Sequence, residues 1–149
     1  MDAFSFIPYG TIVDELQHIV YENPDLTPAE RDAEYLKLEK KYRPYLSFEG
    51  IPYLENGTRW QYQMHIYESP FYYIDYCLAQ CVALGFLGLS RADFADALDK
   101  YLTFLRATGS VSFGELVEGA GLKPPFEAGA LKEIAASSAE VIREVEKKI

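Results

Sequence analysis

Residues 71–89 are FYYIDYCLAQCVALGFLGL, a run of nineteen residues in which only Asp75 carries a charge. A helix with apolar residues on almost every face is typical of the centre of a domain, where no side meets water. The sequence predicts that this helix begins at Pro70, with Ser69 as its cap. We therefore expect one central buried helix, with the other segments of the chain packed around it.

The segments before this run also show helical patterns. Apolar residues recur at helical spacing in GTIVDELQHIVYENP, residues 10–24, at Ile12, Leu16, Ile19 and Val20. Thr27 and Pro28 followed by Glu30 form a capping-box pattern, which predicts a second helix that stops before Pro44. Residues 44–58, PYLSFEGIPYLENGT, are rich in Pro, Gly and Asn and are predicted to form a long loop.

Three further helices are expected after the central run. The first is capped by Ser90, ends near Gly109 and would bury one stripe: Phe94, Ala97, Leu98, Tyr101, Leu102 and Leu105. A short helix over residues 112–118 follows. The last runs from Gly129 to the C-terminus and would turn inward Leu131, Ile134, Ala135, Ser138, Val141, Ile142 and Val145. With no strand pattern and no internal repeat, the sequence predicts an all-α multi-helix bundle in a single domain, residues 1–149.

The bulk composition excludes several classes of function. The net charge of -9 and the pI of about 4.7 argue against nucleic acid as a partner, which would need clustered Lys and Arg. No run approaches ~20 apolar residues, so no membrane span is expected. The first residues lack the pattern of a secretory signal. Cys77 and Cys81 are expected to be buried thiols in a reducing compartment, and the expected location is cytoplasmic.

Two histidines are candidates for chemistry, and the first is His18. It ends the string DELQH, residues 14–18, which imitates the zinc helix H-E-x-x-H with Asp14 in place of the first histidine. Asp14 and His18 could hold a metal only with a third ligand from elsewhere, for example across a dimer interface. The other interpretation is an exposed polar helix face, so the sequence favours no metal site in this chain.

The second histidine opens HIYESPFYYIDY, residues 65–76. In a helix, residues three or four apart share a face, which applies to Tyr73 with Tyr76 and to Tyr72 with Tyr76. Phenols and an imidazole such as His65 are donors that can hold a peptide carbonyl or an oxyanion. Core packing with satisfied hydroxyl groups explains the same rings equally well. The residues alone leave both interpretations open.

At this point the sequence resembles a known family. HIYESPFYYIDYCLAQCVAL is similar to the segment that follows the zinc helices in the thimet oligopeptidase/oligoendopeptidase F family of zinc metallopeptidases. GTIVDELQHIVYENPDLTPAER and KKYRPYL upstream, and GLKPPFEAGALKEI downstream, also resemble helices of that family. The resemblance covers essentially the entire chain. It implies an all-helical catalytic domain with a channel in which short peptides are cleaved.

The resemblance also implies roles for five residues. His65 matches the family residue that helps to bind the substrate carbonyl near the zinc. Tyr73 and Tyr76 match tyrosines whose hydroxyls face the scissile peptide and its tetrahedral intermediate. Tyr67 and Tyr72 are further substrate-binding candidates. These roles come from the resemblance and not from the spacing of the rings.

The chain departs from the family in one respect, because H-E-x-x-H occurs nowhere in it. It resembles the C-terminal quarter or so of such an enzyme, with substrate-side residues but without the zinc ligands or the general base. We expect no cofactor in this chain alone, zinc in the intact family enzyme, and no activity in isolation. The expected partners are peptides, and either further copies of the chain or the missing N-terminal part of the peptidase. The alternative is a non-catalytic helical homodimer that binds peptides.

Overall fold

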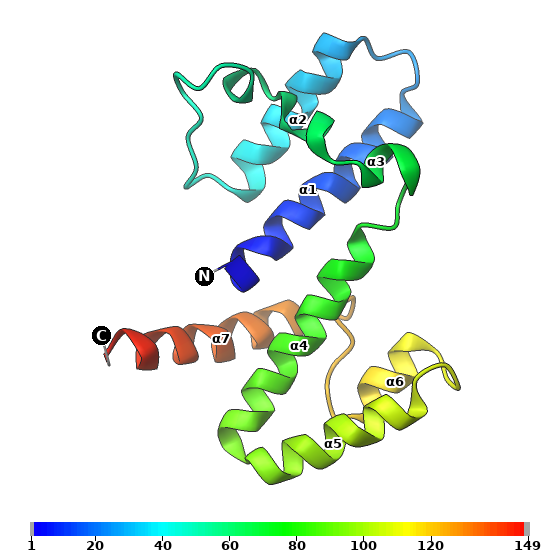
Figure 1. Cartoon of the computed structure of the whole chain (residues 1–149), viewed down its shortest axis with the longest axis vertical. Helices are drawn as coiled ribbons and strands as arrows, with labels where there is room; N and C mark the ends of the chain where they lie inside the picture. The colour runs from blue at the N-terminus through cyan, green and yellow to red at the C-terminus, as the bar shows by residue number, and fades with distance from the viewer. Residues whose placement is uncertain (1, 148–149) are drawn as a thin grey trace. The chain divides into compact units, whose positions relative to one another are not determined.

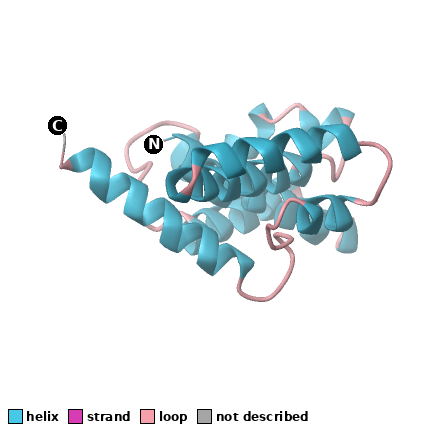
Figure 2. Ribbon diagram, turned by 90° about the horizontal axis from the view of Figure 1, so that it is seen from below, coloured by secondary structure: helices cyan, strands magenta, loops and turns pink. Residues whose placement is uncertain are grey.

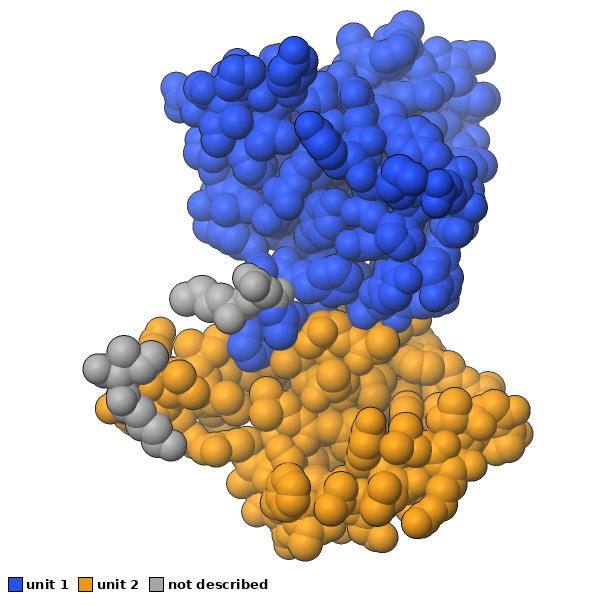
Figure 3. Space-filling model, in the orientation of Figure 1, with its two compact units in different colours: residues 1–77 blue, residues 78–149 orange. Residues whose placement is uncertain are grey.

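The computed structural model describes residues 2–147, and within that range the regular elements are all helices (Figure 2). The prediction of an all-α fold is confirmed. The chain divides into two compact units, Met1–Cys77 and Leu78–Ile149 (Figure 3). The boundary falls within one helix, α4 (Ile74–Ala92). The two units are described in turn.

Unit 1 is built on two helices that lie side by side, α1 (Asp2–Glu22) and α2 (Pro28–Tyr42) (Figure 1). The apolar stripe predicted in the first helix faces α2, since Ile12 and Leu16 are buried and Ile19 and Val20 pack against the same core. The core of the unit consists of Ile12, Leu16, Tyr35, Leu38 and Trp60. Removal of these large side chains from water is the main stabilising term for the unit.

The start of α2 follows the prediction from the sequence. The Thr27 hydroxyl accepts a hydrogen bond from the backbone N–H of Glu30, and the Glu30 carboxylate accepts one from the backbone N–H of Thr27 at 2.8 Å. This capping box satisfies backbone donors that the first turn of a helix leaves open. The helix ends at Tyr42, one residue before Arg43 and two before Pro44, as expected.

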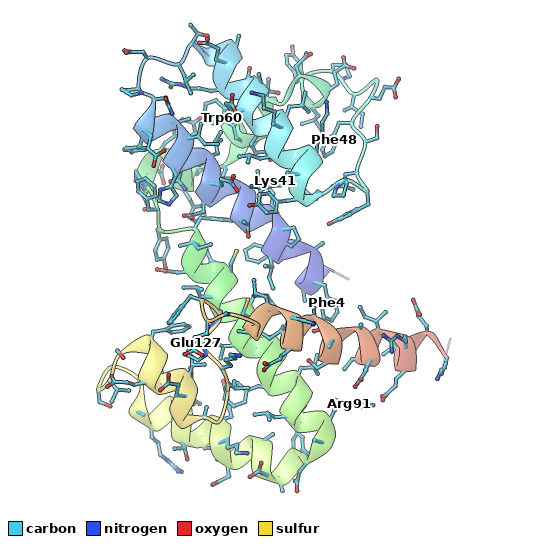
Figure 4. All side chains as sticks on the ribbon, turned by 180° about the vertical axis from the view of Figure 1, so that it is seen from behind. Phe4, Lys41, Phe48, Trp60, Arg91 and Glu127 are labelled. Carbon is cyan, nitrogen blue, oxygen red and sulfur yellow. The ribbon has the colours of Figure 1, made fainter. Side chains whose placement is uncertain are left out.

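Polar contacts also join α1 to α2. Nζ of Lys41, labelled in Figure 4, lies 2.8 Å from Oε1 of Glu15, and the Tyr42 hydroxyl donates to the same carboxylate. The hydrogen bonds from Lys41 and Tyr42 lower the pKa of Glu15 below its ordinary value. The ion pair with Lys41 is exposed and contributes little to stability, whereas the hydrogen bond with Tyr42 is partly buried.

Residues 44–64 connect α2 to the candidate site and contain the predicted loop. Its second half folds into two short 3₁₀ helices, η1 (Leu54–Asn56) and η2 (Thr58–Tyr62). Trp60 anchors η2 to α2, because its ring is buried in the core and its Nε1–H donates to Oδ1 of Asp32 at 2.8 Å. The chain then enters α3 (His65–Glu68).

The predicted start of the central helix is wrong. Instead of one helix from Pro70, the structure has the single turn α3, a break, and α4 from Ile74. Phe71 adopts φ +63°, a left-handed conformation that no α-helix accommodates. Its backbone N–H donates to a buried side chain of α1, Gln17, at 2.8 Å. A tertiary hydrogen bond therefore replaces the helical one at this point.

Unit 2 contains the rest of α4 together with α5 (Phe94–Ala107), α6 (Phe113–Gly119) and α7 (Ala130–Glu146). The predicted cap at Ser90 is wrong, since α4 continues to Ala92 and the cap of α5 is Asp93. The Asp93 carboxylate accepts from the backbone N–H groups of Ala95 and Asp96, at 3.0 and 3.1 Å. Ser90 instead donates to the Leu87 carbonyl within α4. An ionised carboxylate at a helix N-terminus makes the stronger cap.

The predicted burial of unit 2 is largely wrong. On α5 only Ala97 of the expected stripe is buried among the described residues, while five of its members are exposed or half-buried: Phe94, Leu98, Tyr101, Leu102 and Leu105. Leu131, Ala135 and Val145 of α7 are exposed too. On α4 the buried positions are Cys77, Cys81, Val82 and Leu84, so this helix is not buried on nearly every face. The sequence shows which helix faces are apolar but not whether another element covers them.

None of the helices within residues 2–147 is both long enough and apolar enough to cross a membrane.

Candidate functional site

Four ring-bearing side chains of unit 1 meet where α3 joins α4. The imidazole of His65 lies with its ring centroid 5.0 Å from Tyr73, 5.7 Å from Tyr76 and 6.5 Å from Tyr72. Tyr76 in turn lies 5.2 Å from Tyr72 and 5.5 Å from Tyr73. We name His65, Tyr72, Tyr73 and Tyr76 the His65 cluster. The structure thus brings together four of the five candidate residues from the sequence.

The members of the His65 cluster differ in exposure. Tyr73 is 8% exposed, whereas Tyr72 and Tyr76 are 47% and 40% exposed. Below Tyr73 lie Phe6 and Tyr9 of α1, with ring centroids 5.8 and 6.0 Å away. The cluster is therefore buried at Tyr73 and exposed to solvent at Tyr72 and Tyr76, where a ligand could reach it.

The surroundings raise the pKa of two phenols of the cluster, Tyr73 and Tyr76. Burial, followed by the influence of Tyr9, Cys77 and Tyr76, raises the pKa of Tyr73 to about 12. Hydrogen bonding with Tyr72, and then loss of solvation, raises the pKa of Tyr76 above its ordinary value. At neutral pH both side chains are neutral O–H groups, and a neutral phenol can donate a hydrogen bond to a carbonyl oxygen.

Two side chains that the sequence analysis did not identify hold His65 in place. The hydroxyl of Tyr9 donates to Oε1 of Gln63 at 2.8 Å, and Nε2 of Gln63 lies 2.6 Å from Nδ1 of His65. Tyr9 lies 54 residues before Gln63, so no local spacing could have indicated the contact. The pairing of Gln63 with His65, two residues apart, depends on the turn between η2 and α3 and shows no recognisable pattern.

A close contact holds the first turn of α4 against α1 beside the cluster. A Cβ atom added at Gly10 would lie 2.1 Å from Sγ of Cys77, a distance that real atoms do not tolerate. Cys77 also donates weakly from Sγ to the carbonyl of Ile7 at 3.8 Å. Glycine is therefore required at position 10 so that the first turn of α4, which carries Tyr76, can lie against α1.

Two arginines lie close to the ring of Tyr9. The guanidinium groups of Arg59 and Arg43 lie 5.0 and 5.6 Å from the centroid of its ring. Burial raises the pKa of Tyr9, and the charge of Arg59 partly opposes that effect. Arg43 also pairs with buried Glu39 at 3.3 Å. Positive charge is thus fixed beside the residues that support His65.

Tyr67, the fifth candidate, lies apart from the His65 cluster. Its ring stacks on Trp60 with a centroid distance of 6.1 Å, and its side chain is 56% exposed. It borders a small cavity of about 170 Å³ lined by Leu16, Gln17, Val20, Tyr21, Arg31, Trp60, Ile66 and Tyr67. In a helical turn, side chains two residues apart point in nearly opposite directions, so Tyr67 and His65 of α3 do not share a surface.

Asp14 and His18 form a pair without further metal ligands. Nε2 of His18 lies 3.5 Å from Oδ2 of Asp14, and the His18 ring lies 5.0 Å from that of Phe71. Burial raises the pKa of Asp14, and His18 partly opposes this. No group of three or more His, Cys, Asp or Glu side chains suited to a metal occurs among residues 2–147. Because zinc requires at least three such protein ligands, these residues do not fit a zinc site.

The chain is similar to one protein family and to several solved structures. The sequence profile of peptidase family M3 matches residues 2–136. An X-ray structure of a protein described as an oligoendopeptidase F superimposes with a TM-score of 0.86 at 46% identity, over 97% of this chain and 25% of that one. PZ peptidase A, solved with an inhibitor, gives 0.84 at 49% identity over 91% and 24%. An oligoendopeptidase F from Bacillus anthracis gives 0.72 at 38% identity over 96% and 22%.

A search of curated proteins found no match. The chain spans about a quarter of the length of the solved structures that it matches. The family profile covers most of the chain, and the three structures share its helical fold at substantial identity. The resemblance inferred from HIYESPFYYIDYCLAQCVAL is therefore confirmed: this chain belongs to peptidase family M3.

Proposed function

We propose that this chain supplies the substrate-binding side of an oligoendopeptidase F-like active site. In this proposal the His65 N–H and the hydroxyls of Tyr73 and Tyr76 hold the carbonyl oxygen of the scissile peptide. The same donors stabilise the oxyanion that forms on it, and Tyr72 lines the approach. The observation that carries the proposal is the convergence of three tyrosine rings, Tyr72, Tyr73 and Tyr76, within 6.5 Å of the His65 ring.

The exposure and protonation of the rings support this role. Tyr72 and Tyr76 are partly open to solvent, and the phenols of Tyr73 and Tyr76, whose pKa values lie above the ordinary one, are neutral hydrogen-bond donors at neutral pH. Donors held in place before the reaction stabilise a developing negative charge without reorganisation. Tyr67, which stacks on Trp60, would contact a more distant part of a peptide.

We further propose that hydrolysis needs polypeptide beyond these 149 residues. The described residues do not fit zinc, and the sequence contains no H-E-x-x-H. In this proposal the chain binds peptide alone but does not cleave it, and zinc is held by the part of a family enzyme that this chain does not match. Metal analysis of the purified chain, with and without a chelator, tests whether Asp14 and His18 recruit an ion after all.

Binding is tested directly on this chain. An N-acetylated, C-amidated hexapeptide is titrated into protein labelled with ¹⁵N at histidine, and the ring signals of His65 and His18 are followed by NMR. We expect saturable shifts at His65 and none at His18. Tyr76→Phe should weaken binding, whereas Tyr62→Phe, which changes an 83% exposed phenol outside the cluster, should not. Equal shifts at both histidines, or none, would contradict the proposal.

The catalytic role is tested by complementation. The chain is combined with a polypeptide that supplies the remaining three-quarters or so of an oligoendopeptidase F, and cleavage of a quenched fluorescent peptide is measured. Tyr76→Phe, Tyr73→Phe and His65→Ala should each lower kcat by roughly 10²–10³-fold, the usual cost of one oxyanion donor. If His65→Ala left turnover intact in an active complex, the assigned role would be withdrawn.

A second candidate is a non-catalytic helical module that forms homodimers. It is favoured by the apolar face of α5, where Phe94 is 70% exposed and Leu98 and Leu105 are 45% and 48% exposed. Contiguous exposed apolar side chains of this kind mark interaction surfaces. Self-association would bury this face of α5, and the His65 cluster of unit 1 would remain able to bind peptides.

A further inference from the structure

Gln63 stands between a phenol and an imidazole and contacts both through its amide group. Oε1 accepts from the Tyr9 hydroxyl at 2.8 Å, and Nε2 lies 2.6 Å from Nδ1 of His65. An amide nitrogen has hydrogens to donate but no lone pair to offer. Because the oxygen of Gln63 is engaged by Tyr9, its nitrogen faces His65, and Nδ1 must be the acceptor.

We propose that Gln63 is a positioning residue that fixes His65 in the tautomer protonated at Nε2, so that the ring presents an N–H donor to the substrate. The identity of the group that accepts from Nε2–H rests on the proposed function. The tautomer itself is a property of this chain and can be measured without any substrate. In neutral histidine the hydrogen bond at one ring nitrogen decides the state of the other.

The neighbours of Tyr9 favour this orientation of the amide over the reverse. With the amide turned over, Gln63 would donate to the phenol oxygen, and the phenol hydrogen would need another acceptor. The guanidiniums of Arg43 and Arg59 beside the ring have only donors, and the nearby Glu39 carboxylate, which also raises the pKa of Tyr9, accepts from Tyr35 and Arg43 instead. The hydroxyl of a half-buried tyrosine requires a partner, and the Gln63 carbonyl supplies it.

The tyrosine rings around His65 also restrict the orientation of its imidazole. Tyr73 and Tyr76 meet the imidazole edge-on, at interplanar angles of 69° and 88°, and Tyr72 stacks on it at 21°. These contacts restrict rotation of the ring, while Gln63 restricts its protonation pattern. Together the rings and Gln63 hold the Nε2–H donor of His65 in one direction. A donor that is already in place does not have to reorient during the reaction.

NMR of the full 149-residue chain tests the inference. Protein labelled with ¹⁵N at histidine is studied at about pH 8.5, roughly two units above the ordinary pKa of imidazole. Long-range ¹H–¹⁵N correlation then distinguishes a protonated ring nitrogen from one with a lone pair. We expect His65 to carry its proton at Nε2. A proton at Nδ1, or signals averaged between both nitrogens, would overturn the inference.

Gln63→Glu supplies the decisive variant. The introduced carboxylate can only accept, so the proton of His65 should move to Nδ1 and the NMR pattern should invert. A residue with a purely structural role would change stability but not the tautomer. Gln61→Glu is the matched control, since Gln61 is exposed and its amide bonds to Asp32 at 3.2 Å. It should leave His65 unchanged, and His18 should be unchanged in both variants.

Tyr9→Phe provides an independent check if Gln63→Glu does not fold. Without the phenol, the Gln63 amide can turn over, and His65 should become a mixture of two tautomers. An unaltered pure Nε2–H state would overturn the inference. The result separates this inference from the proposed function: a correct tautomer without peptide binding contradicts only the function, and peptide binding with the wrong tautomer contradicts only the role of Gln63.

Discussion

The backbone N–H of Phe71 donates a 2.8 Å hydrogen bond to Oε1 of Gln17, a side chain 54 residues earlier in the chain. Gln17 is 2% exposed, and its Nε2 donates to the Val13 carbonyl at 3.1 Å. Phe71 has a left-handed backbone, and its ring lies 5.0 Å from those of His18 and Tyr21. A buried amide of α1 thus fixes the break before α4, and the break sets the directions of Tyr72 and Tyr73.

The first prediction concerns Gln17. Gln17→Leu should lower the free energy of unfolding by about 1–3 kcal/mol, because it leaves the Phe71 N–H and the Val13 carbonyl without this partner. Urea unfolding followed by circular dichroism measures the change. Gln61→Leu, at an exposed site, should stay within about 0.5 kcal/mol of the parent. Equal effects of the two substitutions would show that the Gln17 amide does not hold the break.

The second prediction concerns the contact of α1 with α4. Gly10→Ala should destabilise the chain by about 1–3 kcal/mol, since the added Cβ would lie 2.1 Å from Sγ of Cys77. Cys77→Ala removes that sulfur, so the double variant should regain a large part of the loss. Apart from Sγ of Cys77, the nearest atom to the added Cβ is Cε1 of Tyr73 at 3.6 Å, which is an ordinary van der Waals contact.

Thermal unfolding of the two single variants and the double variant measures this coupling. Gly119→Ala is the control, because a Cβ there meets nothing within 4 Å, and it should be neutral or slightly stabilising. Strict additivity of Gly10→Ala and Cys77→Ala would mean that the two positions do not interact.

The third prediction is a pH dependence. Burial raises the pKa of Tyr73 to about 12, above the ordinary value of about 10 that the unfolded chain has. Between these two values the unfolded state binds fewer protons than the folded state. The contribution of Tyr73 to the free energy of unfolding should therefore be constant below about pH 10 and fall as the pH rises towards 12. Urea unfolding at pH 9, 10 and 11 measures the slope.

Tyr73→Phe is the comparison for this slope, since phenylalanine keeps the ring but has no proton to lose. The variant should lose less stability than the parent between pH 10 and 11. Other phenols with raised pKa, among them Tyr9 and Tyr76, leave a residual slope in both proteins. Identical slopes would exclude a raised pKa at Tyr73.

The fourth prediction tests the apolar face of α5. If it is an interface between copies of the chain, sedimentation should show an association that strengthens with concentration. Leu102→Glu should weaken the association, because a carboxylate would be carried into an apolar contact. Thr103→Glu, the next residue along an exposed helix, is the matched control and should associate like the parent. A parent chain that stays monomeric at high concentration would remove the homodimer from consideration.

Helix-level features were predictable where the physics is local. The capping box at Thr27 and the stop before Pro44 depend on residues within one turn, and the structure has both. The start of α4 was not predictable, because its cause, the bond from Phe71 to Gln17, joins residues far apart in the chain. The cap at Asp93 was missed for a different reason, since Ser90 offered a competing local signal.

The sequence by itself determined the helical class, the family, and the concentration of rings in residues 65–76. Which rings meet was settled by tertiary structure: Tyr67 turned to Trp60, whereas Tyr72, Tyr73 and Tyr76 joined His65. Tertiary structure also supplied Tyr9 and Gln63. Periodicity records only which side chains share a helix face. Contacts between distant segments, and the covering of an apolar face, depend on how those segments pack, and no local pattern contains that information.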